Sequence, residues 1–137
     1  MRRTRVLIAE DETLIRLDLH RLLEASGYDV CGLAIDGIEA VECALDLRPD
    51  LIVLDVKMPR LDGVEAARCI LAAYHVPIVM LTAYGYGELI SRGLDAGVVG
   101  FVVKPFRERD LLDALRDALR EDPDSDALVY IRRGVGP

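Results

Sequence analysis

The amino-acid sequence predicts an α/β protein: a doubly wound (βα)5 domain in which helices cover both faces of a five-stranded parallel sheet. Short apolar runs alternate with longer segments of helical periodicity from residue 5 to residue 120, which is the pattern of repeated βα units. The short runs are apolar throughout, as in strands buried on both faces. A chain of 137 residues, of which 52% are hydrophobic, can form one domain with a complete core.

Five short runs rich in Val, Ile and Leu are expected to form the strands. They are residues 6–9, 30–34, 51–54, 77–81 and 100–103. Pro77 can begin the fourth strand because the first residue of a strand needs no ladder donor. Right-handed connections between successive parallel strands then place helices on both faces of the sheet.

Five segments with apolar residues at helical spacing are expected to form the helices. They are residues 13–25, 37–48, 64–73, 88–96 and 109–120. Gly27 follows the first of them and suits the left-handed position at which many helices end. The fourth helix is intrinsically weak because Gly93 lies inside it, and an interior glycine costs about 1 kcal/mol relative to alanine.

Residues 121–137 form a tail beyond the domain, which spans residues 5–120. The tail begins with an acidic, turn-like stretch, and residues 127–131 then have strand character. Two interpretations stay open: a flexible terminus, and a short strand that packs on the domain or on a second copy.

Composition argues against several classes of function. The formal net charge of −7 and the isoelectric point near 4.8 argue against binding to a nucleic-acid backbone as the main task. No apolar run approaches the ~20 residues of a membrane span, and the first apolar segment is too short for a signal peptide, so a cytoplasmic location is expected. The widely spaced Cys31, Cys43 and Cys69 favour buried reduced thiols over a disulfide or metal framework.

Polar residues stand at the carboxyl ends of four of the predicted strands. They are Glu10-Asp11-Glu12, Asp55, Thr82-Ala83 and Lys104-Pro105. Each has an ordinary explanation as a helix cap, a turn residue or a surface charge. In an open parallel sheet, however, the carboxyl ends of the strands form the edge at which ligands bind. Compatible groups on four strand ends therefore predict a functional site.

The three carboxylates at this edge, Glu10, Asp11 and Asp55, would repel one another at neutral pH unless a cation lies among them. Oxygen ligands at an open site suit Mg²⁺, which binds one or two carboxylates together with phosphate oxygens. One oxygen of Asp55 would remain free to attack phosphorus in line. Lys104 would add the opposing positive charge, and Thr82 a hydrogen bond to a phosphoryl oxygen.

Five sequence motifs together resemble the receiver domain of two-component response regulators. They are Leu7-Ile8-Ala9-Glu10-Asp11-Glu12, Leu54-Asp55-Val56-Lys57-Met58-Pro59, Asp62-Gly63, Leu81-Thr82-Ala83 and Val103-Lys104-Pro105-Phe106. The resemblance covers residues 5–120 in the correct order and spacing, and it implies a flavodoxin-like fold with strand order 2-1-3-4-5. The motifs at residues 8–12 and 55–59 are most similar to those in receivers of antiterminator-type (ANTAR) regulators, whose RNA-binding output domain is not expected in this chain.

The resemblance implies that Asp55 accepts a phosphoryl group from the phosphohistidine of a sensor histidine kinase or a phosphotransfer protein. It also implies Mg²⁺ as the cofactor, bound by Asp11, Asp55 and the backbone carbonyl of Lys57. Glu10 would contact the ion through water. It stands where many members of the family have aspartate, so the metal contact there is expected to differ.

Lys104 is implied as the phosphate-binding lysine, with a cis peptide bond to Pro105. Thr82 and Phe101 are implied as the switch pair, and the small Ala83 leaves room for the phosphoryl group. Phe101 has no hydroxyl, so a switch that uses a tyrosine hydrogen bond is absent. Simple core packing stays an open interpretation of Phe101.

Phosphorylation is expected to change the surface formed by residues 85–120, where the weak helix at 88–96 lies. That surface would control a partner or output domain, and a homodimer through residues 88–120 is one form of such a contact. The protein would then act in signalling, with at most self-catalysed phosphorylation and dephosphorylation, rather than as an enzyme.

Two other functions stay open. A haloacid dehalogenase-like phosphatase also phosphorylates an aspartate after a strand, but that family has a second aspartate two residues further on, where this chain has Lys57. A degenerate receiver would serve only as a docking module, and the intact set of Asp11, Asp55, Thr82 and Lys104 argues against it. The phosphate-binding motifs of nucleotide-binding domains are missing from the sequence.

Lys57 and Tyr84 stand two residues beyond Asp55 and Thr82, at the positions that tune the lifetime of the aspartyl phosphate in receivers. Their bulk over the site would hinder an attacking water molecule. We therefore predict that Lys57→Ala and Tyr84→Ala each change the half-life of phosphorylated Asp55, measured as loss of the phosphoryl group over time. Wild-type half-lives in both variants would contradict this prediction.

Overall fold

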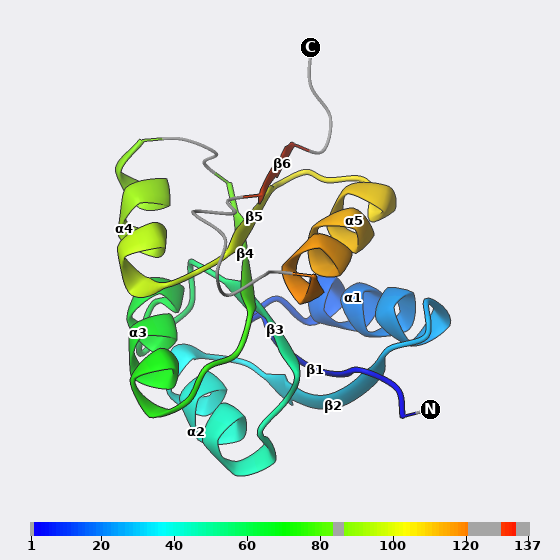
Figure 1. Ribbon diagram of the computed structural model, residues 1–137, viewed down its shortest axis with the longest axis horizontal. Coiled ribbons are helices and arrows are strands. Elements are labelled where there is room, and N and C mark those ends of the chain that lie inside the picture. The colour runs from blue at the N-terminus through cyan, green and yellow to red at the C-terminus, as the bar shows by residue number, and fades with distance from the viewer. Residues whose placement is uncertain (1, 84–86, 121–129, 134–137) are drawn as a thin grey trace.

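The computed structural model describes residues 2–83, 87–120 and 130–133, and within them a six-stranded sheet runs through the centre of the molecule (Figure 1). Its strands are β1 (Arg5–Ala9), β2 (Asp29–Ala34), β3 (Leu51–Asp55), β4 (Ile78–Thr82), β5 (Gly100–Val103) and β6 (Tyr130–Arg133). Neighbouring strands pair in parallel, in the order β2-β1-β3-β4-β5-β6. The predicted order of the first five strands is confirmed.

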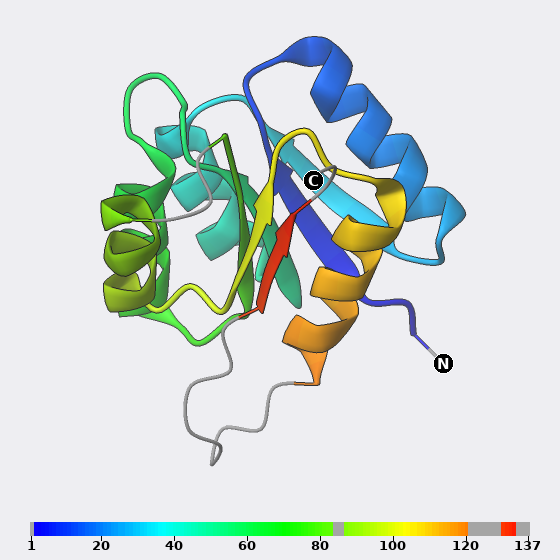
Figure 2. The ribbon, with the colours of Figure 1, turned by 90° about the horizontal axis from the view of Figure 1, so that it is seen from above.

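Helices cover both faces of the sheet, as Figure 2 shows from above. They are α1 (Thr13–Ala25), α2 (Gly37–Leu47), α3 (Gly63–Ala73), α4 (Glu88–Ala96) and α5 (Glu108–Leu119). In this view α1 and α5 lie on one side of the sheet, and α2, α3 and α4 lie on the other. No helix of the described residues is long and apolar enough to cross a membrane.

Each face of the sheet has its own hydrophobic core, because successive residues of a strand point to opposite faces. In β1, Leu7 belongs to the core beneath α2, α3 and α4, whereas Val6 and Ile8 belong to the core beneath α1 and α5. Every residue of β3 is buried, including Asp55 at its end. The position of that aspartate is therefore fixed by packing on both faces of the sheet.

Two aspartates cap the helices that follow β2 and β3. Asp36 accepts a hydrogen bond from the Glu39 amide at 2.7 Å at the start of α2, and Asp62 accepts one from the Glu65 amide at 2.9 Å at the start of α3. Caps of this kind stabilise a helix by about 1 kcal/mol each. Both aspartates stand at the carboxyl edge of the sheet, so they also fix the loops that reach it.

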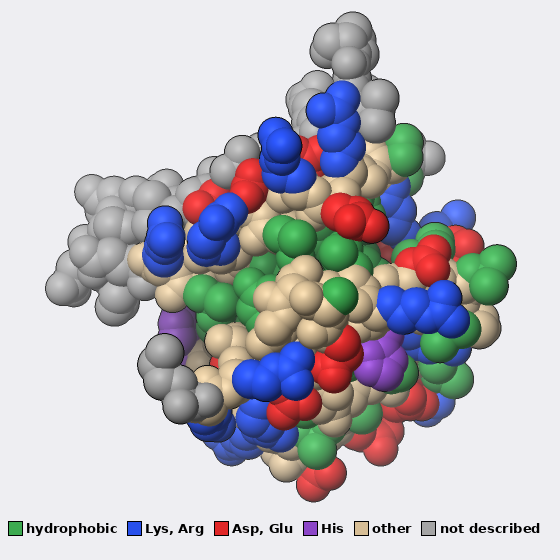
Figure 3. Space-filling view, turned by 90° about the vertical axis from the view of Figure 1, so that its right-hand side faces the viewer, with side chains coloured by type: hydrophobic (Ala, Val, Ile, Leu, Met, Phe, Trp, Pro, Cys, Tyr) green, Lys and Arg blue, Asp and Glu red, His purple; other side chains and the backbone are tan. Residues whose placement is uncertain are grey.

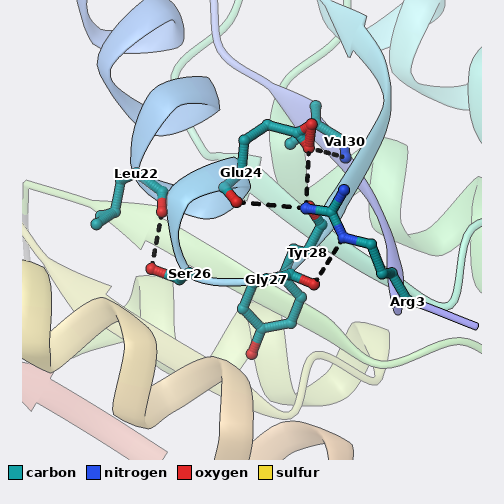
Figure 4. A network of polar contacts seen from close by, with 7 residues as sticks. All are labelled: Arg3, Leu22, Glu24, Ser26, Gly27, Tyr28 and Val30. Atoms are coloured by element: carbon teal, nitrogen blue, oxygen red, sulfur yellow. Dashed lines mark hydrogen bonds and ion pairs between the residues drawn. The ribbon is translucent and has the colours of Figure 1, made fainter. Parts of the chain in front are cut away.

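The turn between α1 and β2 is tied to the N-terminal segment by Arg3 (Figure 4). Its guanidinium donates hydrogen bonds to the carbonyl oxygens of Glu24 and Gly27 at 3.3 and 3.1 Å, and it also bonds the carbonyl oxygen of Tyr28. Gly27 has a φ of 98°, in the left-handed region. The Glu24 carboxylate accepts a bond from the Val30 amide at 3.3 Å, which connects the turn to β2.

At the other edge of the sheet, β6 adds a strand to the five that the sequence predicts. It pairs with β5 from Gly100 opposite Tyr130 to Val103 opposite Arg133. This pairing covers backbone groups that β5 would otherwise expose at the edge of the sheet. Residues 127–129 of the segment with strand character lie outside the described residues.

The cysteines are free thiols, but their burial differs from the expectation. Cys31 and Cys43 are half-buried, and burial raises the pKa of both thiols. Cys69 is exposed, because it lies on the side of α3 away from the buried Ala67 and Ile70. The prediction of buried thiols is therefore wrong for Cys69.

Gly63, at the start of α3, lies against the backbone at the end of β3. A methyl group added to it would lie 2.2 Å from the carbonyl oxygen of Asp55, so only glycine allows this approach. We predict that Gly63→Ala lowers the free energy of unfolding by about 2 kcal/mol or more, because overpacking forces the backbone to move. Denaturant titration would measure the change.

Gly27→Ala is the matched control, because a methyl group there meets open space and strains only the left-handed backbone. Its expected cost is about 1 kcal/mol. A cost for Gly63→Ala no larger than that of Gly27→Ala would contradict the close approach of α3 to β3.

Candidate functional site

The carboxyl ends of β1, β3, β4 and β5 meet around one pocket of about 700 Å³. The residues singled out at the strand ends that line it are Asp11, Glu12, Asp55, Lys57, Thr82, Ala83 and Lys104. Asp62, which caps α3, and Leu89 of α4 line it as well. The pocket therefore touches both the ends of the strands and the start of two helices.

Three carboxylates lie close together beside this pocket. One oxygen from each of Glu10, Asp11 and Asp55 lies within 4.8 Å of the others. Glu10 and Asp55 are buried, whereas Asp11 is exposed to solvent. Carboxylate oxygens at a site that opens to solvent are the donors that Mg²⁺ prefers. The donor set therefore fits the ion that the sequence implies.

Lys104 is the positive partner of two of these carboxylates. Its Nζ donates to Glu10 Oε1 at 3.1 Å and to Asp55 Oδ2 at 3.2 Å. Burial alone would lower the pKa of Lys104, but the charges of Asp55 and Glu10 raise it above its ordinary value. The Lys104 amide donates to the Thr82 carbonyl oxygen at 2.7 Å, and the peptide bond to Pro105 is cis. Both its backbone and its ammonium group are thus held at the site.

Glu10 is a fully buried carboxyl group whose pKa is raised from 4.5 to about 7. Burial is the largest cause, and the Asp55 carboxylate adds to it through a hydrogen bond and charge repulsion. Lys104 acts in the opposite direction without cancelling these effects. In the metal-free protein, Glu10 therefore changes its charge near neutral pH.

Thr82 and Phe101 are both buried, one at the pocket and one beneath α4. Thr82 is the last residue of β4 and lines the pocket. Phe101 packs in the core beneath α2, α3 and α4, where a methyl group added to Gly93 would lie 2.7 Å from its ring. The glycine that weakens α4 is thus the residue that lets the helix rest on the phenylalanine ring.

Two contacts near the pocket could not be predicted from local motifs, because each joins separate elements. Asp62 pairs with Arg92 of α4 at 3.7 Å, which links the start of α3 to the weak helix. The buried Asp36 pairs with Arg60 at 3.0 Å, and Arg60 has a left-handed φ of 70°. This second pair holds the loop after β3 against the start of α2.

Of the two residues expected to tune the phosphate lifetime, the structure describes only Lys57. Lys57 is exposed where it lines the pocket. Tyr84 lies outside the described residues.

The fold and the pocket define the class of protein. Acidic residues follow β1, an aspartate ends β3, a threonine ends β4 and a lysine follows β5, all around one pocket. Residues 6–116 match the response regulator receiver domain, and the chain belongs to this family. Receivers are domains of two-component signalling rather than of metabolic catalysis.

Individual relatives agree with this assignment. The chain is 50% identical to the transcriptional regulatory protein PdtaR of Mycobacterium tuberculosis over 115 residues, which are 84% of this chain and 56% of that protein. This chain therefore spans little more than half the length of that relative. It is similar to the response regulator domain of Thermotoga maritima CheB, at 31% identity and a TM-score of 0.82 over 89% of this chain and 100% of that one.

A second solved structure is informative about the pocket. The receiver domain of the sensor histidine kinase PA1611 from Pseudomonas aeruginosa is 32% identical, with a TM-score of 0.79 over 88% of this chain and 100% of that one. That structure has a magnesium ion coordinated in its active-site cleft.

The raised pKa of Glu10 predicts how stability depends on pH in the metal-free protein. The contribution of Glu10 to stability is fully present below about pH 4.5 and is lost as the pH rises through about 7. At the higher pH the Glu10 carboxylate is charged, and a charged carboxylate is less stable in the buried site of the folded protein than in the unfolded chain. With one pKa unit worth about 1.4 kcal/mol, the loss amounts to about 3 kcal/mol. We predict that Glu10→Gln, which stays neutral, loses less stability than the wild type over this range.

Denaturant titrations with chelator present, at several pH values, would measure this difference. Asp29→Asn, at the amino end of β2, makes the same kind of change away from the pocket and should keep the wild-type profile. Equal pH profiles for the wild type and Glu10→Gln would contradict the prediction.

Proposed function

We propose that this receiver is the phosphoacceptor of a two-component system and that Asp55 takes the phosphoryl group. The observation that carries the proposal is the setting of the Asp55 carboxylate. It is buried at the end of β3, with Glu10 and Asp11 oxygens within 4.8 Å and the Lys104 ammonium at 3.2 Å. A nucleophile in this setting has a positive charge beside it and room for a cation.

Mg²⁺ is the cofactor that we infer, because its preferred donors are gathered here and a related receiver holds this ion. Asp11, Asp55 and the backbone carbonyl of Lys57 would hold it directly, and Glu10 through water. When bound, the ion neutralises the charge that builds on a transferring phosphoryl group.

The phosphoryl donor is inferred to be the phosphohistidine of a sensor kinase or phosphotransfer protein. A carboxylate oxygen of Asp55 attacks phosphorus in line while the phosphorus–nitrogen bond breaks, and the electron pair of that bond stays on the imidazole. Lys104 remains beside the new phosphoryl oxygens as their counter-charge. The Thr82 hydroxyl donates a hydrogen bond to one of them, and Ala83 leaves space for the group.

The partner that carries the histidine must reach the rim of the pocket, and an apolar groove lies beside it. The groove runs between α1 and the segment after β5, with Ile15, Leu19 and Phe106 among its lining residues. Lys104 lines both the groove and the pocket around Asp55. Figure 3 shows the side of the molecule that carries α1 and α5, where hydrophobic side chains gather between charged ones. A partner seated in the groove would bring its histidine to the pocket.

We infer that phosphorylation is read at the surface of α4, β5 and α5. Thr82 would move toward the phosphoryl group, and the space that it leaves allows the buried ring of Phe101 to change its orientation. Because α4 packs directly on the Phe101 ring at Gly93, a movement of the ring changes how the helix packs on the sheet. A helix weakened by an interior glycine re-orders at low cost. This surface is where control of a partner or output domain, or contact with a second copy, is expected.

Incubation of the purified protein with acetyl phosphate and Mg²⁺ tests the proposal, with intact mass as the readout. We predict a gain of one phosphoryl group in the wild type and none in Asp55→Asn, because an amide is no nucleophile for phosphorus. Asp29→Asn should gain the group as the wild type does, and chelation of Mg²⁺ should prevent the gain. Amide exchange of residues 88–97 should also differ between the phosphorylated and unphosphorylated protein.

The other outcomes are equally informative. A gain that persists in Asp55→Asn would refute Asp55 as the acceptor. No gain in a wild type that binds Mg²⁺ would favour the docking module, and turnover of a free phosphate ester would favour the phosphatase. Unchanged amide exchange in α4 on phosphorylation would refute α4 as the responding element.

A further inference from the structure

Arg16, near the start of α1, binds the backbone of the loop that carries the acidic pair, Glu10 and Asp11. Its Nη1 donates hydrogen bonds to the carbonyl oxygens of Glu10 at 2.8 Å and Asp11 at 3.2 Å. Its Nη2 lies 3.5 Å from Thr13 Oγ1. The guanidinium thus contacts the loop backbone on the way from β1 into α1, and it leaves the carboxylates themselves untouched.

The other contacts of this loop hold Glu10 and the backbone of Glu12 rather than Asp11. Glu12 is the residue before α1, and its side chain makes no capping hydrogen bond. Glu10 donates from its amide to the Ala34 carbonyl oxygen, and its carboxylate accepts hydrogen bonds from Lys104 and from the Glu12 amide at 3.3 Å. Among the described residues, no hydrogen bond or ion pair holds the exposed carboxylate of Asp11. The backbone of Asp11, which Arg16 binds, therefore sets the direction in which the side chain leaves the chain.

We propose that Arg16 is a positioning residue for the cation site: by fixing the peptide groups of Glu10 and Asp11, it holds the Asp11 carboxylate toward Asp55. The inference rests on the proposed function, in which Asp11 and Asp55 hold Mg²⁺. Arg16 acts through the backbone of a ligand, much as groups behind a metal ligand orient it in other proteins.

The charge of Arg16 makes this role distinguishable from a general electrostatic one. A guanidinium is always positive, so by charge alone it repels a nearby cation, and its removal would tighten Mg²⁺ binding. By positioning, its presence orders a ligand, and its removal weakens Mg²⁺ binding. The two roles therefore predict changes of opposite sign in the dissociation constant.

Lysine cannot replace arginine in the positioning role. The planar guanidinium holds Nη1 at two carbonyl oxygens while Nη2 lies beside Thr13 Oγ1, whereas lysine has one nitrogen on a flexible stem and cannot hold both positions. Arg16→Lys therefore keeps the charge and loses the brace. It also serves as a milder variant if Arg16→Ala fails to fold.

The test is a titration of the unphosphorylated, initially metal-free protein with Mg²⁺, followed through backbone amide shifts. The expected result is that Arg16→Ala and Arg16→Lys each weaken Mg²⁺ binding about ten-fold, the lower end of the effect of groups that orient metal ligands. Arg21→Ala removes the same charge from the same helix and should leave the affinity unchanged. Amide exchange of residues 10–13 in the metal-free protein should be faster in both Arg16 variants.

Each result decides the question. Mg²⁺ affinity in Arg16→Ala equal to or tighter than that of the wild type would overturn the positioning role while leaving the proposed function intact. Wild-type affinity in Arg16→Lys would also overturn it, because the fixed fork of the guanidinium would then not be needed. A wild type that binds no Mg²⁺ would overturn the inferred cofactor and this inference together.

Discussion

The crowding of negative charge at the carboxyl end of the sheet is the constraint on which the rest of the structure depends. Ala9 pairs with Leu54, so β1 and β3 deliver Glu10 and Asp55 to the same level. Lys104 follows β5, which lies two strands from β3, and its single positive charge pairs with two carboxylates, those of Glu10 and Asp55. Without a cation the negative charges of the site exceed its positive charge, and the burial of Glu10 increases the free-energy cost of this excess.

The charges stay together because the surrounding anchors act on the backbone. Gly63 lets α3 press against the end of β3, Asp36 holds the loop after β3 through Arg60, and Arg16 holds the loop after β1. None of these anchors uses a carboxylate oxygen of Asp11 or Asp55, because Arg16 binds only the backbone carbonyl oxygens of its loop. The frame is therefore rigid, while the carboxylate oxygens that the proposed chemistry requires stay available.

Much of the fold follows from local patterns, and much of the detail at the site does not. Apolar runs and helical stripes predict the strands, the helices and their succession along the chain, because each pattern is confined to one element, whereas the order of the strands in the sheet came from the resemblance to receivers. The contacts of Arg16 and Arg60 depend on where a long side chain ends after folding, which no spacing records. Gly93 shows the limit most clearly. From the sequence it is a flaw in a helix, and only the fold reveals the ring of Phe101 beneath it.

That contact also limits how α4 can move. A helix that rests directly on an aromatic ring has no intervening side chain that could repack to fill a gap, and protein interiors do not tolerate empty space well. If α4 shifts away from the sheet, either a void opens beside Phe101 or the ring turns to fill it. Ring and helix are thus forced to move as one unit, which favours two discrete arrangements over a graded series. A receiver built this way would present one of two distinct surfaces to its partner and no intermediate one.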